Sequence, residues 1–235
     1  MAGYGHIAHN VEVVRARVAS ACARSGRAAG DVEILAVSKF HPLEAVELAW
    51  EAGLRSFGES RVQEAETKYA AARAAHPGLR LDLIGHLQGN KAKKAVELFD
   101  MIESVDSLEL IETLAARAAT AGRRVDILLE LHTGEESKQG FRDADALAAG
   151  VEAVMGARSI NLRGLMTMAP LTDNEAFIRA SFRRLRSAFE RLREEFVAPD
   201  FNVLSMGMSG DFEIAIEEGS TLVRLGTAIF GERQP

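Results

Sequence analysis

The chain has 235 residues, a net charge of −6 and 47% hydrophobic residues, which is the composition of an ordinary globular protein. This acidic balance offers no basic surface to nucleic acid, so we expect no nucleic-acid partner. Cys22 is the single cysteine, which excludes a disulfide within the chain and suits a reducing compartment. Neither a signal-peptide core nor an apolar run of about 18 residues is present. We therefore expect a cytoplasmic protein without membrane association.

The first predicted helix lies within residues 1–30 and ends near Gly26. Five apolar residues share one of its faces at helical spacing: Ile7, Val11, Val14, Val18 and Cys22. Strand-like and helical segments then alternate. The predicted strands are 34–38, 55–58, 81–87, 101–106, 125–131, 162–166, 202–205 and 222–225. The predicted helices between them are 43–50, 61–76, 91–99 with Asn90 as its cap, 107–122 and 182–196.

This alternation predicts a parallel α/β architecture. About eight strands and one extra N-terminal helix indicate a single (β/α)8 TIM barrel over residues 1–235. The main rival is an open, doubly wound sheet. The barrel is favoured because no glycine-rich turn marks the point where such a sheet would reverse its strand order.

Polar residues follow most of the predicted strands. In a barrel, the carboxyl ends of the strands meet at one rim, where the active sites of such proteins are built. The residues expected at that rim are Lys39, Glu59, Ser60, His86, Gln88, Asp106, Ser205 to Ser209, Arg224, Gly226 and Thr227. We expect them to converge on one site.

The segment LSMGMSGDFEIAIEEG indicates an anion site. Gly207 allows a tight turn, Ser209 is a candidate helix cap, and Gly219 would end that helix. The free backbone N–H groups of such a helix start attract a phosphate. Asp211 and Glu213 must then point away from the anion. The alternative is an ordinary capped helix without a ligand.

Lys39 ends the first predicted strand, in ILAVSKFHP. One interpretation is a solvated charge; the other is a lysine that forms a Schiff base. An amine is nucleophilic only when neutral, so its pKa would have to fall from about 10.4 towards ~7–8. Burial and Arg224 across the barrel could lower it. A Schiff-base lysine beside a phosphate site, with further backbone donors at Gly226 and Thr227, indicates pyridoxal phosphate.

Seven motifs in order resemble those of the pyridoxal phosphate homeostasis proteins, a family also called proline synthetase co-transcribed protein. They are AVSKFHP, FGESRVQE, HLQGNK, SKQGF, LRGLMTMAP, LSMGMSGDFEIAI and VRLGTAIFGER, spread over residues 34–232. Ser60 stands where the family usually has asparagine near the cofactor ring, and Gly89 replaces a serine. These departures affect only the expected contacts at the edge of the ring.

The resemblance implies a barrel like the N-terminal domain of alanine racemase, without the second β-domain of that enzyme. It also implies that Lys39 holds pyridoxal phosphate as an internal Schiff base and that Arg224 faces the pyridine nitrogen. The phosphate contacts it implies are Ser205, Ser209, Gly226 and Thr227.

Members of this family bind, buffer and deliver the cofactor, so the expected partners are pyridoxal phosphate and, transiently, apo-enzymes that use it. We expect a monomer without robust turnover. A cation at Arg224 would keep the pyridine nitrogen unprotonated and the ring a poor electron sink. A racemase also needs a second base, and Tyr4 and Tyr69 do not follow predicted strands. The alternatives are a pyridoxal-phosphate-dependent racemase and a lysine-dependent aldolase-type barrel without that cofactor.

Four further residues keep two interpretations each. His86 either lies near the cofactor ring or is a loop histidine bonded to backbone. His41 and His132 are expected to be structural or solvated. Lys138 either helps to accept and pass on the cofactor or is a solvated loop charge. The scattered histidines show no metal-ligand spacing, so we predict no metal.

Overall fold

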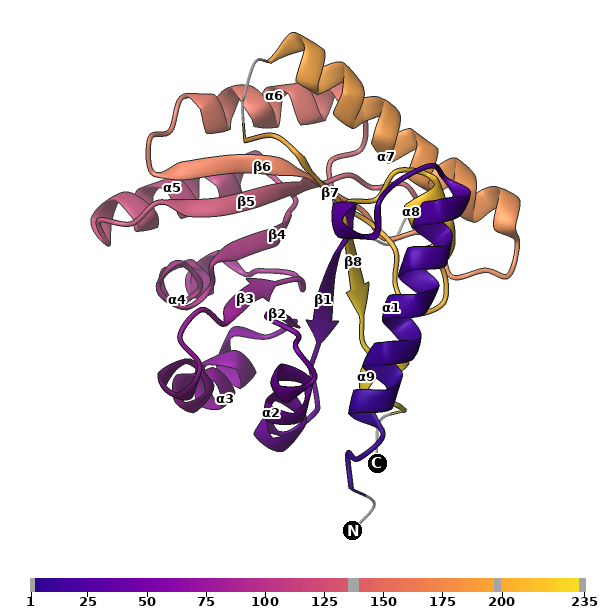
Figure 1. Cartoon of the computed structure of the whole chain (residues 1–235). Helices are drawn as coiled ribbons and strands as arrows, with labels where there is room; N and C mark the ends of the chain where they lie inside the picture. The colour runs from indigo at the N-terminus through magenta and orange to yellow at the C-terminus, as the bar shows by residue number, and fades with distance from the viewer. Residues whose placement is uncertain (1–2, 135–139, 197–199, 233–235) are drawn as a thin grey trace.

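The computed structural model describes residues 3–134, 140–196 and 200–232. Eight parallel strands close into a barrel in chain order, with β1 next to β8 (Figure 1). The predicted (β/α)8 barrel is therefore confirmed. The strands are β1 Glu33–Val37, β2 Ser56–Glu59, β3 Arg80–Leu83, β4 Met101–Val105, β5 Val125–Glu130, β6 Ile160–Met166, β7 Val203–Ser205 and β8 Leu222–Leu225.

Helices surround the barrel, and all of them except α1 follow a strand. They are α1 Ile7–Arg24, α2 Leu43–Glu51, α3 Val62–Ala75, α4 Ala92–Leu98, α5 Leu108–Thr120, α6 Ala144–Met155, α7 Glu175–Glu195, α8 Phe212–Glu217 and α9 Thr227–Phe230. Helix α6 is absent from the predicted set. It buries Leu147, Val151 and Val154. Many alanines lie between these residues, so the helical spacing of large apolar side chains is hard to recognise in the sequence.

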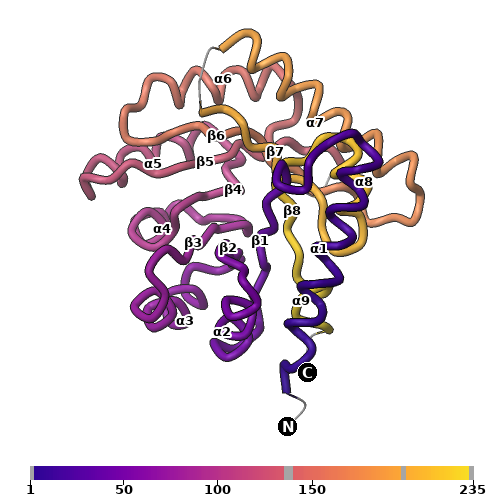
Figure 2. The backbone as a smooth tube through the Cα atoms, viewed as in Figure 1, coloured from indigo at the N-terminus to yellow at the C-terminus, as the bar shows by residue number. Residues whose placement is uncertain are grey.

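Helix α1 precedes the barrel and packs beside α8 and α9, as the tube in Figure 2 shows. All five residues of its predicted apolar face are buried. Gly26 follows it with φ +68°, a conformation that glycine adopts without the strain of a side chain. The predicted N-terminal helix and its end are confirmed.

The predicted cap of α4 is wrong. A 3-10 turn over Gly89–Lys91 precedes the helix, so Asn90 lies inside a helical turn and not before it. Helix α4 has Lys91 at its N-cap, which makes no side-chain cap hydrogen bond. The sequence shows a favourable capping residue, but not the extra tight turn that moves the helix start.

The interior of the barrel is both apolar and charged. A buried cluster joins Leu35, Met101, Leu128, Met166 and Leu222, one residue from each of five strands. Side chains two positions apart share a face of a strand. Glu103 and Arg224 thus follow Met101 and Leu222 into the barrel, towards the carboxyl ends of β4 and β8. The interior of the barrel thus combines an apolar cluster with the buried charged side chains of Glu103 and Arg224.

Candidate functional site

A cavity of about 490 Å³ opens at the rim formed by the carboxyl ends of the strands. We call it the Lys39 pocket. Its lining residues are Val37, Lys39, His41, Ile84, Met168, Leu171, Met208, Ser209, Gly210, Arg224, Gly226 and Thr227. The structure therefore brings together five of the predicted site residues, namely Lys39, Ser209, Arg224, Gly226 and Thr227.

The turn after β1 determines which side chains enter this pocket. Phe40 has φ +67°, an uncommon left-handed conformation for a residue with a large side chain. Lys39 and His41 on either side of it both line the Lys39 pocket. Phe40 itself lines a neighbouring pocket and is half exposed. The reversal at Phe40 places two titratable side chains in one cavity.

Two neutral oxygens inside the barrel accept hydrogen bonds from the Arg224 guanidinium. Its Nη1 donates to Ser205 Oγ at 2.6 Å, and its Nη2 donates to the backbone oxygen of Thr167 at 2.7 Å. Ser205 in turn donates to Glu103 Oε2 at 2.5 Å. Ser205 is fully buried and lies beneath Arg224, outside the lining of the pocket. Ser205, which we predicted as a phosphate contact, thus supports the Arg224 guanidinium.

Glu103 lies 3.8 Å from the Arg224 guanidinium and is fully buried. Burial raises the pKa of this carboxyl, and the nearby Arg224 acts in the opposite direction. The cation at Arg224 thus has a buried acidic neighbour inside the barrel, and Arg224 also lines the cavity.

The β7 and β8 loops meet along one wall of the pocket. Gly207 has φ +98°, and a Cβ there would lie 2.6 Å from Ala215 Cβ, so the turn requires glycine. Ser209 does not cap α8, contrary to the prediction, because the chain makes a further turn and α8 begins at Phe212. Ser209 Oγ instead accepts from Ala228 N at 3.1 Å and joins the two loops.

Neither of the acidic residues of this segment, Asp211 and Glu213, is among the residues that line the Lys39 pocket. Asp211 Oδ1 accepts from Met208 N at 2.5 Å within its own loop. Burial raises the pKa of Asp211. Glu213 forms two hydrogen bonds with Arg17 on α1, at 2.9 and 3.2 Å. Glu213 therefore meets the condition for an anion site, whereas Asp211 lies close enough to Arg224 to interact with its charge.

Ser60 and His86 lie in a second cavity, of about 430 Å³, together with Phe40. The loops that carry them approach closely, since a Cβ on Gly85 would lie 2.4 Å from Ser60 O. His86 Nδ1 lies 3.1 Å from Asp106 Oδ2 at the surface. These two predicted site residues are neighbours of each other but do not line the cavity that contains Lys39.

His41 is a pocket residue that the sequence analysis treated as structural or solvated. It is buried and stacks on Phe230, with ring centroids 5.1 Å apart. The Tyr4 ring lies nearly perpendicular to the His41 ring, with centroids 5.9 Å apart. The sequence feature that could have identified His41 as a pocket residue is its position two residues after Lys39 in SKFHP. Lys138 lies outside the described residues, and its predicted role stays a prediction.

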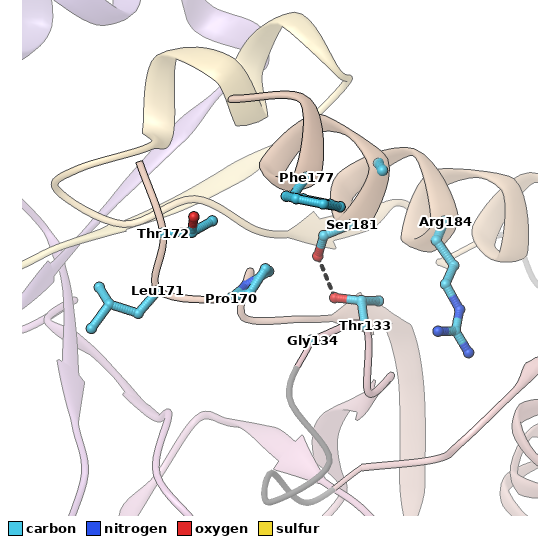
Figure 3. Close-up of a pocket in the computed structure, with 9 residues that line it drawn as sticks. Thr133, Gly134, Pro170, Leu171, Thr172, Phe177, Ser181 and Arg184 are labelled. Atoms are coloured by element: carbon cyan, nitrogen blue, oxygen red, sulfur yellow. Dashed lines mark hydrogen bonds between the residues drawn. The ribbon is translucent and has the colours of Figure 1, made fainter. Parts of the chain in front are cut away.

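A third cavity, of about 480 Å³, lies between the β5 and β6 loops and helix α7 (Figure 3). Leu171 lines both this cavity and the Lys39 pocket. The hydroxyls of Thr133 and Ser181 are hydrogen bonded on its wall. Thr133 Oγ1 also lies 2.7 Å from Thr167 Oγ1, which donates to Leu131 O. These hydroxyls therefore connect α7 to Thr167, at the end of β6. The backbone oxygen of Thr167 accepts a hydrogen bond from Arg224.

Among the residues that the structure describes, no group of three or more His, Cys, Asp or Glu side chains gathers as a metal-binding cluster. No helix in this part of the chain is long and apolar enough to cross a membrane.

Comparison with known proteins agrees with the fold. The family model of the alanine racemase N-terminal domain matches residues 4–234. The pyridoxal phosphate homeostasis protein of Vibrio cholerae is 38% identical over 230 residues, which is 97% of this chain and 96% of that protein. PipY of Synechococcus elongatus, solved with PLP bound, is 40% identical with a TM-score of 0.79, covering 93% of this chain and all of that one.

A more distant likeness shows the fold alone. Alanine racemase of Clostridium difficile is 13% identical, with a TM-score of 0.77 over 95% of this chain and 57% of that enzyme. The fold and the family model thus define an alanine racemase N-terminal domain. Within that class, the chain belongs to the pyridoxal phosphate homeostasis protein family. The homologous proteins of Vibrio cholerae and Escherichia coli are named for homeostasis of a cofactor and not for an enzymatic reaction.

Proposed function

We propose that this protein binds pyridoxal phosphate in the Lys39 pocket, with Lys39 attaching the cofactor as a Schiff base. It would act in cofactor homeostasis by binding, buffering and delivering the cofactor to apo-enzymes, as a cytoplasmic monomer without robust turnover. The single observation behind the proposal is one cavity that contains an amine, a buried guanidinium and the ends of the β7 and β8 loops.

These residues fit the chemical groups of the cofactor. Lys39 supplies the amine, and Ser209, Gly226 and Thr227 lie together on the β7–β8 side, where backbone donors suit a phosphate. Arg224 lines the cavity from β8, as a partner for the pyridine nitrogen. Ser205 would act through Arg224, whose guanidinium it bonds. Ser60 and His86 remain proposed contacts at the edge of the ring, reached from the adjoining cavity.

Arg224 supports a carrier over an enzyme. Bound pyridoxal phosphate supplies an electron sink, and the sink is strongest when its ring nitrogen is protonated. An arginine stays charged at any physiological pH and disfavours a second positive charge beside it. Hydrogen bonds from Arg224 to Ser205 and Thr167 keep that cation in place. The residues would therefore favour storage of the cofactor over carbanion chemistry.

An absorption experiment tests the attachment. Wild type, Lys39→Ala and Lys93→Ala would each be incubated with pyridoxal phosphate and their spectra recorded. Lys93 is an exposed lysine of α4 and serves as the matched control. We expect a Schiff-base band in wild type and in Lys93→Ala, and its loss in Lys39→Ala. Identical spectra in all three proteins would exclude Lys39 as the anchor.

One observation favours the racemase alternative. His41 lines the same cavity as Lys39 and is a titratable group that could serve as a second base. The loaded protein would be incubated with amino acids in deuterated water. We expect negligible exchange of the α-hydrogen for the carrier. Exchange that depends on both Lys39 and His41 would establish the enzyme instead.

A further inference from the structure

A buried network of polar and charged residues lies directly behind the strand end that carries Lys39. We call it the Lys68 network, and its members are Ser38, Glu59, Glu64, Lys68 and Tyr69. Glu59 and Tyr69 are fully buried, and the Lys68 side chain is 8% exposed. None of these residues lines the Lys39 pocket, so the function proposed above does not account for them.

Lys68 directs all three of its N–H donors into this network. They reach Ser38 O at 2.8 Å, Glu59 Oε1 at 2.7 Å and Glu64 Oε1 at 3.3 Å. Ser38 Oγ donates to Glu59 Oε1 at 2.7 Å, so the Tyr69 hydroxyl, 2.6 Å away, donates to Ser38. A buried cation is tolerated because every donor is used. One of those donors holds the carbonyl of the residue before Lys39.

The residue after Lys39 is held by the same network. Phe40 N donates to Glu64 Oε1 at 2.6 Å, the oxygen that also accepts from Lys68. A left-handed conformation has an energetic cost for any residue with a side chain, and Phe40 adopts one, with φ +67°. A hydrogen bond to a charged acceptor is strong enough to offset that cost. A side-chain oxygen of α3 thus supports the reversal that places both Lys39 and His41 in the pocket, in addition to the backbone hydrogen bond from His41 N to Ser38 O at 3.0 Å.

We propose that Glu64 and Lys68 are positioning residues for Lys39. They hold the two peptide groups on either side of it and so keep its long side chain in the pocket before any cofactor arrives. This inference rests on the proposed function, in which Lys39 attaches the cofactor. An anchor ordered in advance loses less conformational entropy on binding, which strengthens the bound state.

The test compares two substitutions of Glu64 with a matched control on the same helix. Glu64→Ala removes the acceptor of Phe40 N, while Glu64→Gln retains an amide oxygen that can accept the same hydrogen bond. Glu66→Ala also breaks an ion pair between α3 and a lysine, Lys94 of α4, but this pair is exposed at the surface. The affinity for pyridoxal phosphate would be measured by absorption. We expect Glu64→Ala to weaken it about tenfold, the effect of one hydrogen bond to a charged group. Glu64→Gln and Glu66→Ala should stay close to wild type.

A second readout needs no cofactor. The apo-proteins would be labelled with a small acylating reagent over a range of pH, and the labelling of Lys39 compared with that of exposed Lys93 by peptide mass spectrometry. In Glu64→Ala we expect the pH profile of Lys39 to move towards the profile of Lys93. In Glu64→Gln it should keep the wild-type form. Urea unfolding of each variant shows that folded proteins are being compared.

The outcomes separate the inference from the function on which it rests. Equal affinities and equal Lys39 profiles in Glu64→Ala and Glu66→Ala would overturn the positioning role. A Glu64→Gln variant that behaves like Glu64→Ala would overturn it too, because the bond to Phe40 would not be the cause. If wild type forms no borohydride-stable adduct at Lys39, the proposed function fails, and the labelling profiles still decide whether Glu64 positions Lys39.

Discussion

Two buried charged networks flank the Lys39 pocket, and they hold different parts of the protein. The Lys68 network lies outside the barrel, between β1, β2 and α3, and its cation donates to the Ser38 carbonyl. The second network lies inside the barrel and consists of Thr167, Ser205, Glu103 and Arg224. Its cation is itself part of the pocket wall.

The difference follows from the two cations. A lysine has three donors on one atom, so Lys68 can gather a carbonyl and two carboxylates at a single point. The planar guanidinium of Arg224 has donors on several edges, so it bonds a hydroxyl and a carbonyl below and still borders the cavity. The lysine network fixes a backbone reversal, and the arginine network fixes the direction of a side chain.

The largest expected effect comes from breaking the Lys68 network. In Lys68→Met, the buried Glu59 loses its cation, and breaking such a pair costs about 3–5 kcal/mol. Burial raises the pKa of Glu59 even with Lys68 present, so the ionised form is disfavoured in the folded state. Glu59 therefore contributes most to stability when it is protonated. This contribution is lost as pH rises from about 4.3, the unfolded pKa, through the raised pKa of the folded state. The loss measured by urea unfolding should therefore be larger at pH 7 than at pH 4.5. A second substitution, Glu59→Gln, should restore part of it; no restoration would contradict the pairing.

The next effect concerns the turn beside Arg224. Arg224 N donates to Gly207 O at 2.9 Å, so the turn is bonded to β8. Gly207→Ala places a Cβ in a left-handed conformation and 2.6 Å from Ala215 Cβ. Both effects together should destabilise the protein by about 2–4 kcal/mol. Gly210→Ala in the same loop is the control, because a Cβ there meets no heavy atom within 4 Å. Equal midpoints in thermal unfolding would show that the turn adapts.

A smaller effect is expected when the arginine network loses its hydroxyl. Ser205→Ala leaves both Arg224 Nη1 and Glu103 Oε2 without that partner inside the barrel. An unsatisfied buried polar group costs about 1–3 kcal/mol. Because Arg224 lines the pocket, affinity for pyridoxal phosphate should fall as well. Ser20→Ala on exposed α1 should change neither quantity. Stability lost without any change in affinity would separate Ser205 from the pocket.

The smallest effect is expected at a surface ion pair, whose contribution to stability depends on pH in the opposite direction from that of the buried Glu59. Hydrogen bonds from Arg179 and Arg24 lower the pKa of Glu217. Its contribution is present above the unfolded value of about 4.3 and lost as pH falls through the folded pKa, opposite in sign to Glu59. Glu217→Gln should make the acid side of the stability profile less steep, with a change of about 0–1 kcal/mol at pH 7. An unchanged slope between pH 5 and 3 would contradict this assignment.

Much of the architecture could be read from local patterns. Each predicted strand overlaps an observed one, since short apolar runs between turns and helices identify strands without knowledge of their partners. Lys39, Arg224 and Thr227 follow or end such runs and so converge on one pocket. The predictions that were wrong also concern local features. Asn90 and Ser209 look like caps, but an added turn moved each helix start.

The sequence by itself determined the order of strands and helices, the closed barrel and the rim on which Lys39 lies, because these depend on periodicity and on rules common to parallel sheets. Only the tertiary structure decided what each rim residue does there. The reversal at Phe40 brought Lys39 and His41 into one cavity, whereas Ser60, which follows β2, lies in another. Inward orientation in the barrel placed Ser205 under Arg224. These roles follow from contacts between distant segments, which no local pattern of residues encodes.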